Sequence, residues 1–249
     1  MTESHPDNAV PVPQQQPVAP LPDAHHPTHE EDEQSLLLKK IIDLQLKLEG
    51  SSMEPFIKKL HEEVLARGIS FFPPCYLADE WGCPDGVPAI AVPFYLVDRK
   101  LTRLEMKHVK EIEKNDDEEI MRILRHEMGH VVNYAYELHK TPDWKKLFGG
   151  FKRPYRENYR PNPFSKKFVK HLDNWYAQKH PDDDFAETFA VWLTPNLDWR
   201  QSYRGWGALK KLEYVDRVMS AIKGQPPTVY PDLDQDMIRA SRIDARQLT

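Results

Sequence analysis

The chain has 249 residues, with 34 Lys and Arg against 39 Asp and Glu and a formal net charge of -5. Its length and its 40% hydrophobic content allow one large domain or two small ones with a real core. The acidic balance argues against a nucleic-acid partner, and no apolar run approaches the roughly 18 residues that a membrane span needs. Two cysteines, Cys75 and Cys83, are too few for a disulfide framework or a zinc ribbon.

Residues 1–34 differ from the rest of the chain. They hold seven acidic residues, seven of the 22 prolines and no Lys or Arg, which leaves 34 basic against 32 acidic residues in 35–249. With few large apolar side chains, this segment cannot offset the entropy of ordering, so we expect a disordered acidic leader. It lacks the basic and apolar regions of a secretory signal, which favours a cytoplasmic protein.

Two helices are predicted at the start of the ordered part. Residues 36–48 carry leucine and isoleucine at helical spacing, with Ser35 as N-cap and Gly50 at the end. A second helix is expected at 55–66, with proline in its first turn and Gly68 after its end. We expect them to cover the core as a helical lid, with a dimerising helix as the alternative.

A strand is predicted at 89–97, where the sequence reads Ala-Ile-Ala-Val-Pro-Phe-Tyr-Leu-Val. Because Pro93 has no N–H for a ladder, an edge position is favoured. Such an edge offers an extended peptide a place to add as a further strand.

A long buried helix follows. Asn115 offers a capping side chain and Glu118 a carboxylate three residues on, so the helix is expected to start there and to end at Pro142. Residues 143–164 are predicted to be a long ordered loop. Three more helices are expected at 166–178, 183–193 and 208–222.

The long helix carries His126-Glu127-Met128-Gly129-His130. Histidines at positions i and i+4 lie on one helix face, so both imidazoles can reach a single zinc ion. Glu127 lies about 100° around the helix, where its carboxylate can take a proton from zinc-bound water. Gly129 keeps this turn thin and leaves room for a neighbouring strand or a substrate. The alternative is a pair of core histidines without metal.

The third ligand is expected on another element. A catalytic zinc has three protein ligands and an open position, whereas a structural zinc has four. No third histidine follows His130 at the metzincin spacing. Asp183 and Glu187, four residues apart in an acidic helix start, share a face. One can bind the zinc while the other accepts the N–H of a ligating histidine, or both serve only to cap the helix.

HEMGH followed by Asp183-Asp184-Phe185-Ala186-Glu187 resembles the gluzincin metallopeptidases. With Trp175-Tyr176-Ala177 and His180-Pro181, it is similar to a bacterial family of zinc-binding metallopeptidases, over roughly residues 68–222. The resemblance implies a mainly α, α+β zincin-like fold with a small sheet over the HExxH helix. We expect one such domain over 35–249, of which the first helix and the tail lie outside the resemblance. Residues 35–67 would be N-terminal helices, 68–222 the catalytic core and 223–249 a C-terminal extension.

Carried onto this chain, the gluzincin pattern makes His126, His130 and Asp183 the zinc ligands and Glu187 the supporting carboxylate. The chain departs from the pattern, because the usual third ligand is Glu and Asp is one methylene shorter; Glu187 is the alternative third ligand. Tyr176 stands where some gluzincin toxins have a tyrosine whose hydroxyl points at the zinc site and could stabilise an oxyanion. The alternative for Tyr176 is a packing role.

Two further groups are weaker signals. Trp192, Trp199 and Trp206 recur every seven residues, but Pro195 interrupts them, which favours packing beneath the site over a stacking platform. Residues 152–160 mix Lys, Arg and Tyr as a single-stranded nucleic-acid groove does. Because the domain is near neutral, a solvated loop or a substrate rim is favoured.

The sequence therefore predicts a zinc-dependent metallopeptidase that acts on peptides or proteins, with Zn²⁺ as cofactor and Glu127 as general base. Two alternatives stay open. One is an interaction protein on a zincin scaffold that uses zinc for folding. The other is a zinc hydrolase that acts on a non-peptide amide.

Overall fold

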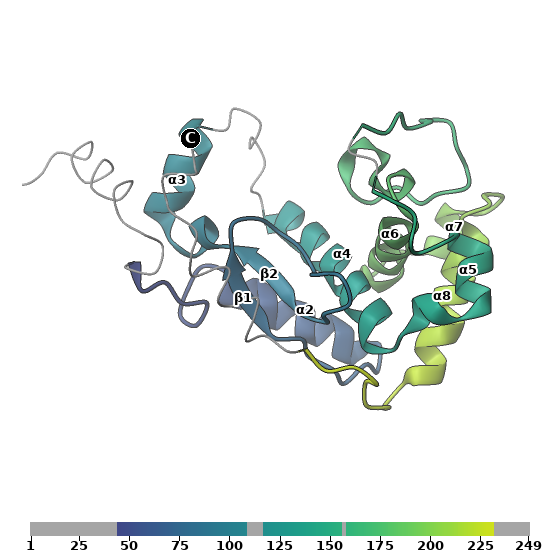
Figure 1. Cartoon of the computed structure of the whole chain (residues 1–249), viewed down its shortest axis with the longest axis horizontal. Coiled ribbons are helices and arrows are strands. Elements are labelled where there is room, and N and C mark those ends of the chain that lie inside the picture. Colours follow the sequence, from purple (N-terminus) through teal and green to yellow (C-terminus); the bar gives the residue numbers. More distant parts are fainter. Residues whose placement is uncertain (1–43, 109–116, 156–157, 232–249) are drawn as a thin grey trace, which may run out of the picture.

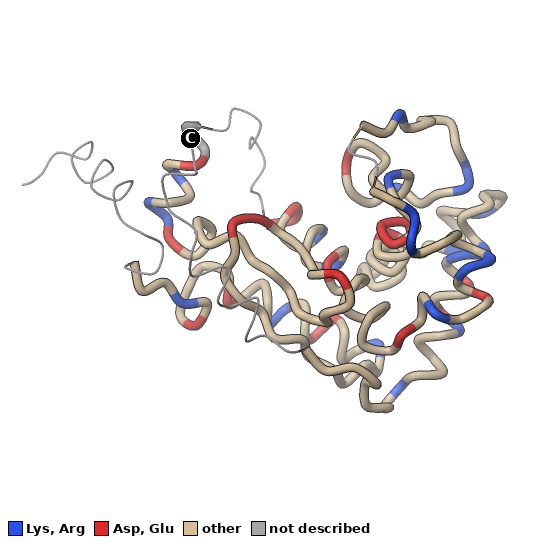
Figure 2. The backbone as a smooth tube through the Cα atoms, in the orientation of Figure 1, with Lys and Arg blue, Asp and Glu red and all other residues tan. Residues whose placement is uncertain are grey.

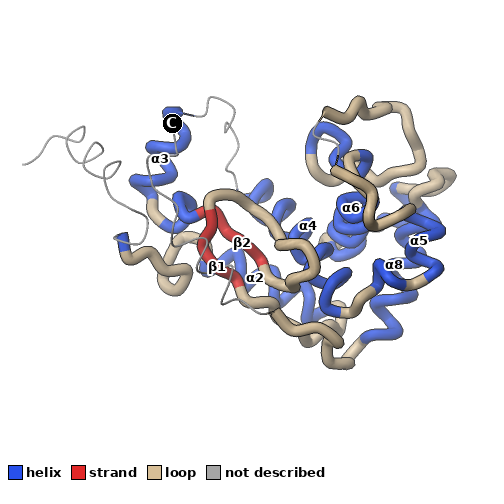
Figure 3. The backbone as a smooth tube through the Cα atoms, viewed as in Figure 1, coloured by secondary structure: helices blue, strands red, loops and turns tan. Residues whose placement is uncertain are grey.

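The computed structural model of the protein describes residues 44–108, 117–155 and 158–231. This part of the chain is mainly helical, with one small parallel sheet of two strands (Figure 3). The α-helices are α2 (Glu54–Ala66), α3 (Arg99–His108), α4 (Asp117–Ala135), α5 (Pro142–Phe148), α6 (Pro181–Leu193), α7 (Trp199–Ser202) and α8 (Leu209–Ile222). The strands are β1 (Cys75–Ala78) and β2 (Ile90–Pro93), and the short 3-10 helices are η2 (Phe94–Val97), η3 (Leu138–Lys140) and η4 (Asp173–Gln178). Within these ranges no helix has the length and apolar character that crossing a membrane requires.

Helix α4 lies at the centre of the fold, with α2 and the sheet on one side and α6 on the other (Figure 1). Its apolar residues Leu124, Met128 and Val131 are fully buried, as their helical spacing predicts. Helix α6 is buried along its whole length because it packs against α4 and also against α8. Polar side chains on these two helices therefore face each other inside the core, where each of them needs a partner.

A buried ion pair joins α2 to α4. The Arg125 guanidinium donates two hydrogen bonds to the Glu63 carboxylate, both at 2.7 Å, and both side chains are less than a tenth exposed. The two parallel hydrogen bonds fix direction as well as distance. This pair sets the position of α4 one residue before His126.

The closest approach of α4 and α6 is at Gly129. A Cβ atom there would lie 2.6 Å from the Cα of Ala186 and 2.8 Å from its carbonyl oxygen. The sequence predicted that Gly129 makes room for a neighbouring strand or a substrate; the neighbour is instead the backbone of a helix. Glycine lets the two helices that carry the polar cluster approach this closely.

The N-terminal predictions have different outcomes. The second predicted helix is confirmed as α2, and Gly68 follows it with a φ of +82°. Of the predicted helix at 36–48, only 44–48 lies within the described residues, and 45–48 is not helical because Gln45 adopts a φ of +48°. The leader 1–34 and the predicted cap Asn115 lie outside the described residues.

The predicted strand at 89–97 is confirmed only as β2. Its second half turns into the 3-10 helix η2, starting directly after Pro93. The predicted edge position is confirmed, because β2 is one of the two strands of the sheet, but its outer edge is not free at Ala91. On the side away from β1, the Ala91 N–H donates to the Gly82 carbonyl at 2.7 Å and its own carbonyl accepts from the Gly82 N–H.

Three predictions between α4 and α6 differ from the structure. The helix does not run to Pro142: Glu137 takes a left-handed φ of +51°, and Pro142 begins α5 with Thr141 as its cap. Part of the predicted loop 143–164 is therefore helical. The helix predicted at 166–178 is reduced to η4. Its early N–H groups bond elsewhere: Lys170 N donates to the Tyr203 hydroxyl at 3.0 Å and Leu172 N to Glu187 at 2.9 Å.

The two remaining helices predicted from the sequence are confirmed. Helix α6 begins at Pro181, two residues before the predicted start, and ends at the predicted Leu193. Helix α8 ends at Ile222, as its apolar spacing indicates.

Candidate metal centre

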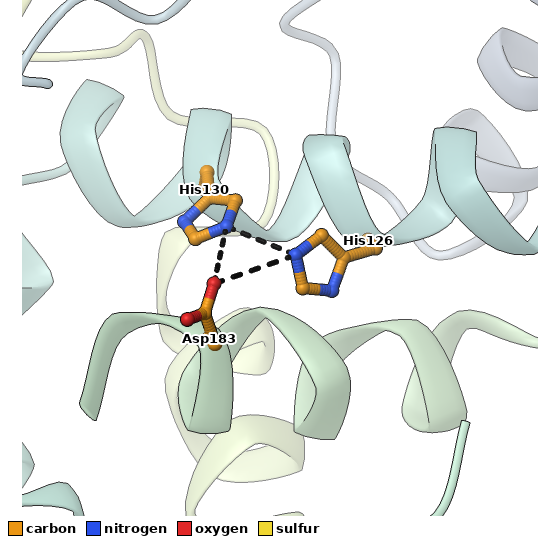
Figure 4. A group of neighbouring side chains, drawn as sticks. All are labelled: His126, His130 and Asp183. Carbon is orange, nitrogen blue, oxygen red and sulfur yellow. Dashed lines mark hydrogen bonds and ion pairs between the residues drawn. The ribbon is translucent and has the colours of Figure 1, made fainter. Parts of the chain in front are cut away.

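Three side chains converge between α4 and α6 (Figure 4). His126 and His130 lie one turn apart on α4, and Asp183 faces them from the first turn of α6. The two Nε2 atoms are 3.1 Å apart, and Asp183 Oδ1 is 3.8 Å from Nε2 of His126 and 3.5 Å from Nε2 of His130. All three side chains are almost fully buried. The two histidines of the HExxH helix and Asp183 thus lie together, as the sequence predicted.

The outer nitrogen of each imidazole is bound to a carboxylate. His126 Nδ1 lies 2.8 Å from Glu187 Oε1, and His130 Nδ1 lies 2.8 Å from Asp182 Oδ2. An ionised carboxylate only accepts hydrogen bonds, so both Nδ1 atoms carry the proton. In the neutral imidazoles both Nε2 atoms then present lone pairs toward each other and toward an Asp183 oxygen.

Asp182 was not singled out as a site residue by the sequence. Its carboxylate accepts from His130, from the Asn133 side chain at 2.6 Å and from the Tyr134 hydroxyl. The cap of α6 is instead His180, whose side chain accepts from the Asp182 N–H. The signal for a second carboxylate at the site was the run of three aspartates. Only one of them can face the histidines directly, so its neighbours need other partners.

Glu187 is fully committed to a supporting role. One oxygen bonds His126, and the other accepts the Leu172 N–H at 2.9 Å. Burial opposes ionisation of this carboxyl, but its interactions with His126, with His171 and with the Leu172 N–H together outweigh burial and hold the pKa of Glu187 below its usual value. Of the two carboxylates left open by the sequence, Asp183 is the one that faces both Nε2 atoms.

The donor set fits a divalent cation. Ligand atoms around tetrahedral zinc stand roughly 3.3 Å apart, close to the three separations observed. Asp183 Oδ2 is buried and has no hydrogen-bond partner among the described residues. Burial alone would lower the pKa of His130, yet the charge and hydrogen bond of Asp182 outweigh it and raise that pKa well above its usual value. The site therefore favours a positive charge at this position, here a proton on His130.

The same interaction lowers the pKa of Asp182. Burial would raise the pKa of this carboxyl, but His130 and the two uncharged donors lower it to about 2. The next residue is different, because burial raises the pKa of Asp184 to about 7 although Lys211 donates to it at 2.6 Å. That pair points toward α8 and lies outside the trio.

Glu127 lies on α4 next to the trio and is 7% exposed. Burial raises the pKa of its carboxyl, against the attraction of His126 and His130, and Asp183 raises it further. A carboxylate whose pKa is moved toward neutrality is suited to accept and return a proton near pH 7.

Tyr176 packs against the site. Its ring meets that of His126 edge-on, with centroids 5.4 Å apart, and its hydroxyl accepts from Lys179 Nζ at 3.0 Å. Burial and the nearby charge of Asp183 raise the pKa of Tyr176. The sequence singled out Tyr176 but missed Lys179. It also gave no specific role to Tyr155, which stacks on His180 with a centroid distance of 4.1 Å.

A cavity of about 940 Å³ opens beside the trio. Asp182, Tyr134 and His180 line its inner end, and the basic segment that begins at Lys152 lines its rim. The sequence favoured a solvated loop or a substrate rim for that segment, and its first residues do border a cavity. Of the tryptophans, Trp192 and Trp199 are buried in the core, as the predicted packing role requires.

Comparison with protein-family models, with curated proteins and with solved structures gives no significant match to the chain. The gluzincin resemblance therefore rests on the residues themselves. Among the described residues, His126, His130 and Asp183 are the group of three or more His, Cys, Asp or Glu side chains close enough to hold one metal ion.

Proposed function

We propose that the protein is a zinc-dependent metallopeptidase with a zincin-like domain, in which His126, His130 and Asp183 hold the ion. The observation that carries the proposal is the convergence of three lone-pair donors, one each from His126, His130 and Asp183. The opposite ring nitrogens of the two histidines are held by Glu187 and Asp182. Such carboxylate–histidine pairs set the tautomer and the ring orientation of metal ligands. A pair of core histidines without metal would not need a further buried carboxylate, Asp183, that turns Oδ1 toward both rings and leaves Oδ2 without a hydrogen-bond partner among the described residues.

A catalytic role is favoured over a structural one by the number of ligands. Structural zinc sites are closed by four protein ligands, whereas catalytic sites have three and an open position. Within the described residues the group consists of three. A buried carboxylate, Glu127, lies beside it and has no ligand role in this arrangement.

Bound zinc would supply a Lewis acid that polarises the scissile carbonyl and lowers the pKa of a water molecule. The chain supplies the proton transfer. Glu127 accepts the proton of the attacking water and returns it to the leaving amine. The Tyr176 hydroxyl, held by Lys179, donates to the oxygen on which negative charge develops. A non-peptide amide would use the same groups, and substrate profiling separates the two.

The test is Glu127→Gln. Zinc should remain bound at one ion per chain, while hydrolysis of unfolded protein or of a peptide library falls by about a hundredfold or more, the usual scale for loss of a general base. A matched control is Glu118→Gln, because Glu118 lies on the same helix at the exposed end. A wild-type protein that binds no zinc contradicts the proposal. Cooperative unfolding on chelation, without any hydrolysis before it, would favour the folding role.

A further inference from the structure

We propose that the cavity beside the metal centre binds a carboxylate of the substrate, and that Lys152 and Arg153 are the residues that recognise it. This inference rests on the proposed peptidase function and deepens it, because it names the class of peptide: one that carries an acidic side chain or a free C-terminal carboxylate near the cleaved bond. Asp182, which supports His130, also lines the cavity, so the cavity adjoins the metal centre, and the inference takes a peptide bound at the centre to extend into it.

The free charges around the cavity are mostly positive. Lys140, Lys145, Lys152 and Arg153 line it, against Asp85 and Asp182. Lys140 is paired with Glu137 outside the cavity, and Lys145 donates to a backbone carbonyl at 3.0 Å. The side chains of Lys152 and Arg153 are exposed and have no ion pair or hydrogen bond with any residue that the structure describes.

The negative charge at the inner end does not oppose this. Both oxygens of Asp182 accept hydrogen bonds, from His130, Asn133 and Tyr134. Asp182 is only 1% exposed and already accepts three hydrogen bonds, so its carboxylate is largely shielded from a ligand in the cavity. Asp85 is exposed at the outer rim and is the single remaining anion among the lining residues.

The cationic segment is held in place over the cavity. His180, at the start of α6, bonds the Arg153 carbonyl through Nε2 at 2.8 Å. In Figure 2 a blue stretch lies on the loop that leaves α5, beside the red start of α6. Tyr155 stacks on His180, and Phe151 stacks on His139 with centroids 4.3 Å apart.

These walls combine a rigid aromatic surface with two unpaired cations. A neutral apolar side chain of the peptide would contact the aromatic surface only. A carboxylate would also gain charge-assisted hydrogen bonds in a space partly shielded from water, where they are stronger than on an open surface.

The experiment measures binding separately from cleavage. Zinc-loaded Glu127→Gln protein is titrated with fluorescein-labelled twelve-residue peptides that carry an internal Glu pair with a C-terminal amide, a Gln pair with a free C-terminal carboxylate, or a Gln pair with an amide. At least one carboxylate peptide should bind about three- to tenfold tighter than the neutral one, the scale of two partly exposed ion pairs. Which of the two does so identifies the source of the carboxylate.

The added substitutions Lys152→Ala/Arg153→Ala should bring that ratio to below about twofold, and higher ionic strength should reduce it in the parent protein. The matched control is Lys166→Ala/Lys167→Ala, an exposed pair of cations that does not line the cavity, which should keep the ratio. Equal binding of all three peptides, no detectable binding of either carboxylate peptide, or a preference that survives Lys152→Ala/Arg153→Ala overturns the inference.

The same peptides separate the two proposals. If the wild type cleaves them without preference for a carboxylate, the cavity assignment fails and the peptidase function stands. If the Glu127→Gln protein shows the preference but the wild type cleaves nothing, the peptidase function fails and the cavity remains a carboxylate site.

Discussion

Replacing Gly129 with alanine should separate the two helices that form the candidate metal centre. The new Cβ would lie 2.6 Å from the Ala186 Cα, where ordinary contact begins at 3.4 Å. The difference of 0.8 Å has to be taken up by movement of backbone, because the atoms in contact belong to the main chain of α6. Asp183 lies one turn earlier on that helix and moves with it.

The expected magnitude follows from this contact. Overpacking of a well-filled core costs about 1–3 kcal/mol, whereas a Gly to Ala change inside a helix by itself gains about 0.5–1 kcal/mol. A net destabilisation shifts Tm by roughly 2–4 °C per kcal/mol for a domain of this size. Metal ligands tolerate displacements of about 0.2 Å, so zinc affinity should fall about tenfold or more.

The assay combines thermal unfolding with zinc titration against a chromophoric chelator. Gly82→Ala is the matched control, because a Cβ there meets nothing within 4 Å. Gly129→Ala/Ala186→Gly should not restore stability, since the clash is with backbone and not with the Ala186 methyl group. A Gly129→Ala protein as stable as the wild type, with unchanged zinc affinity, would refute the account of how α4 and α6 position the centre.

Two further predictions concern stability. Burial lowers the pKa of His171 from 6.5 to about 4. Between these two values the unfolded chain binds a proton that the folded chain does not. The contribution of His171 to stability is therefore full above about pH 6.5 and is lost as pH falls toward 4. Between pH 7 and pH 5 this contribution changes by about 2 kcal/mol, and urea unfolding should show it as a difference of that size between the pH dependence of the wild type and that of His171→Gln, because the other titrating groups, Asp184 among them, are common to both proteins. Lys211→Met should lower the free energy of unfolding by about 3 kcal/mol or more, because it leaves Asp184 buried without its partner. Adding Asp184→Asn should recover part of that loss in the same assay. Equal stability of Lys211→Met and the wild type would contradict the role of the pair.

Much of the helical framework was predictable because it depends on local spacing. The apolar positions of α4 and α8 and the proline at the start of α2 are short-range signals. The start of α5 was also readable, since Thr141 followed by Pro142 is a cap followed by a first-turn proline. The short strand β1 had no comparable signal, because four residues with mixed exposure show no alternation.

The candidate site was predictable in its direct ligand set and not in its surroundings. The i, i+4 spacing places His126 and His130 on one face whatever the rest of the chain does. The division of roles between Asp183 and Glu187 depends on how far α6 slides along α4, which Gly129 sets through a contact 57 residues away in the chain. The left-handed turn at Asn174 and Trp175, with φ near +57° and +53°, places Tyr176 against His126. A helix through 166–178 would have placed it elsewhere.

The most direct test of the account is the anomalous diffraction of a crystal of the zinc-loaded protein. The account predicts one zinc peak, bound by Nε2 of His126, Nε2 of His130 and a carboxylate oxygen of Asp183, with Glu187 still on His126 Nδ1. A peak coordinated by Glu187 in place of Asp183, or no peak between the two histidines, would contradict it.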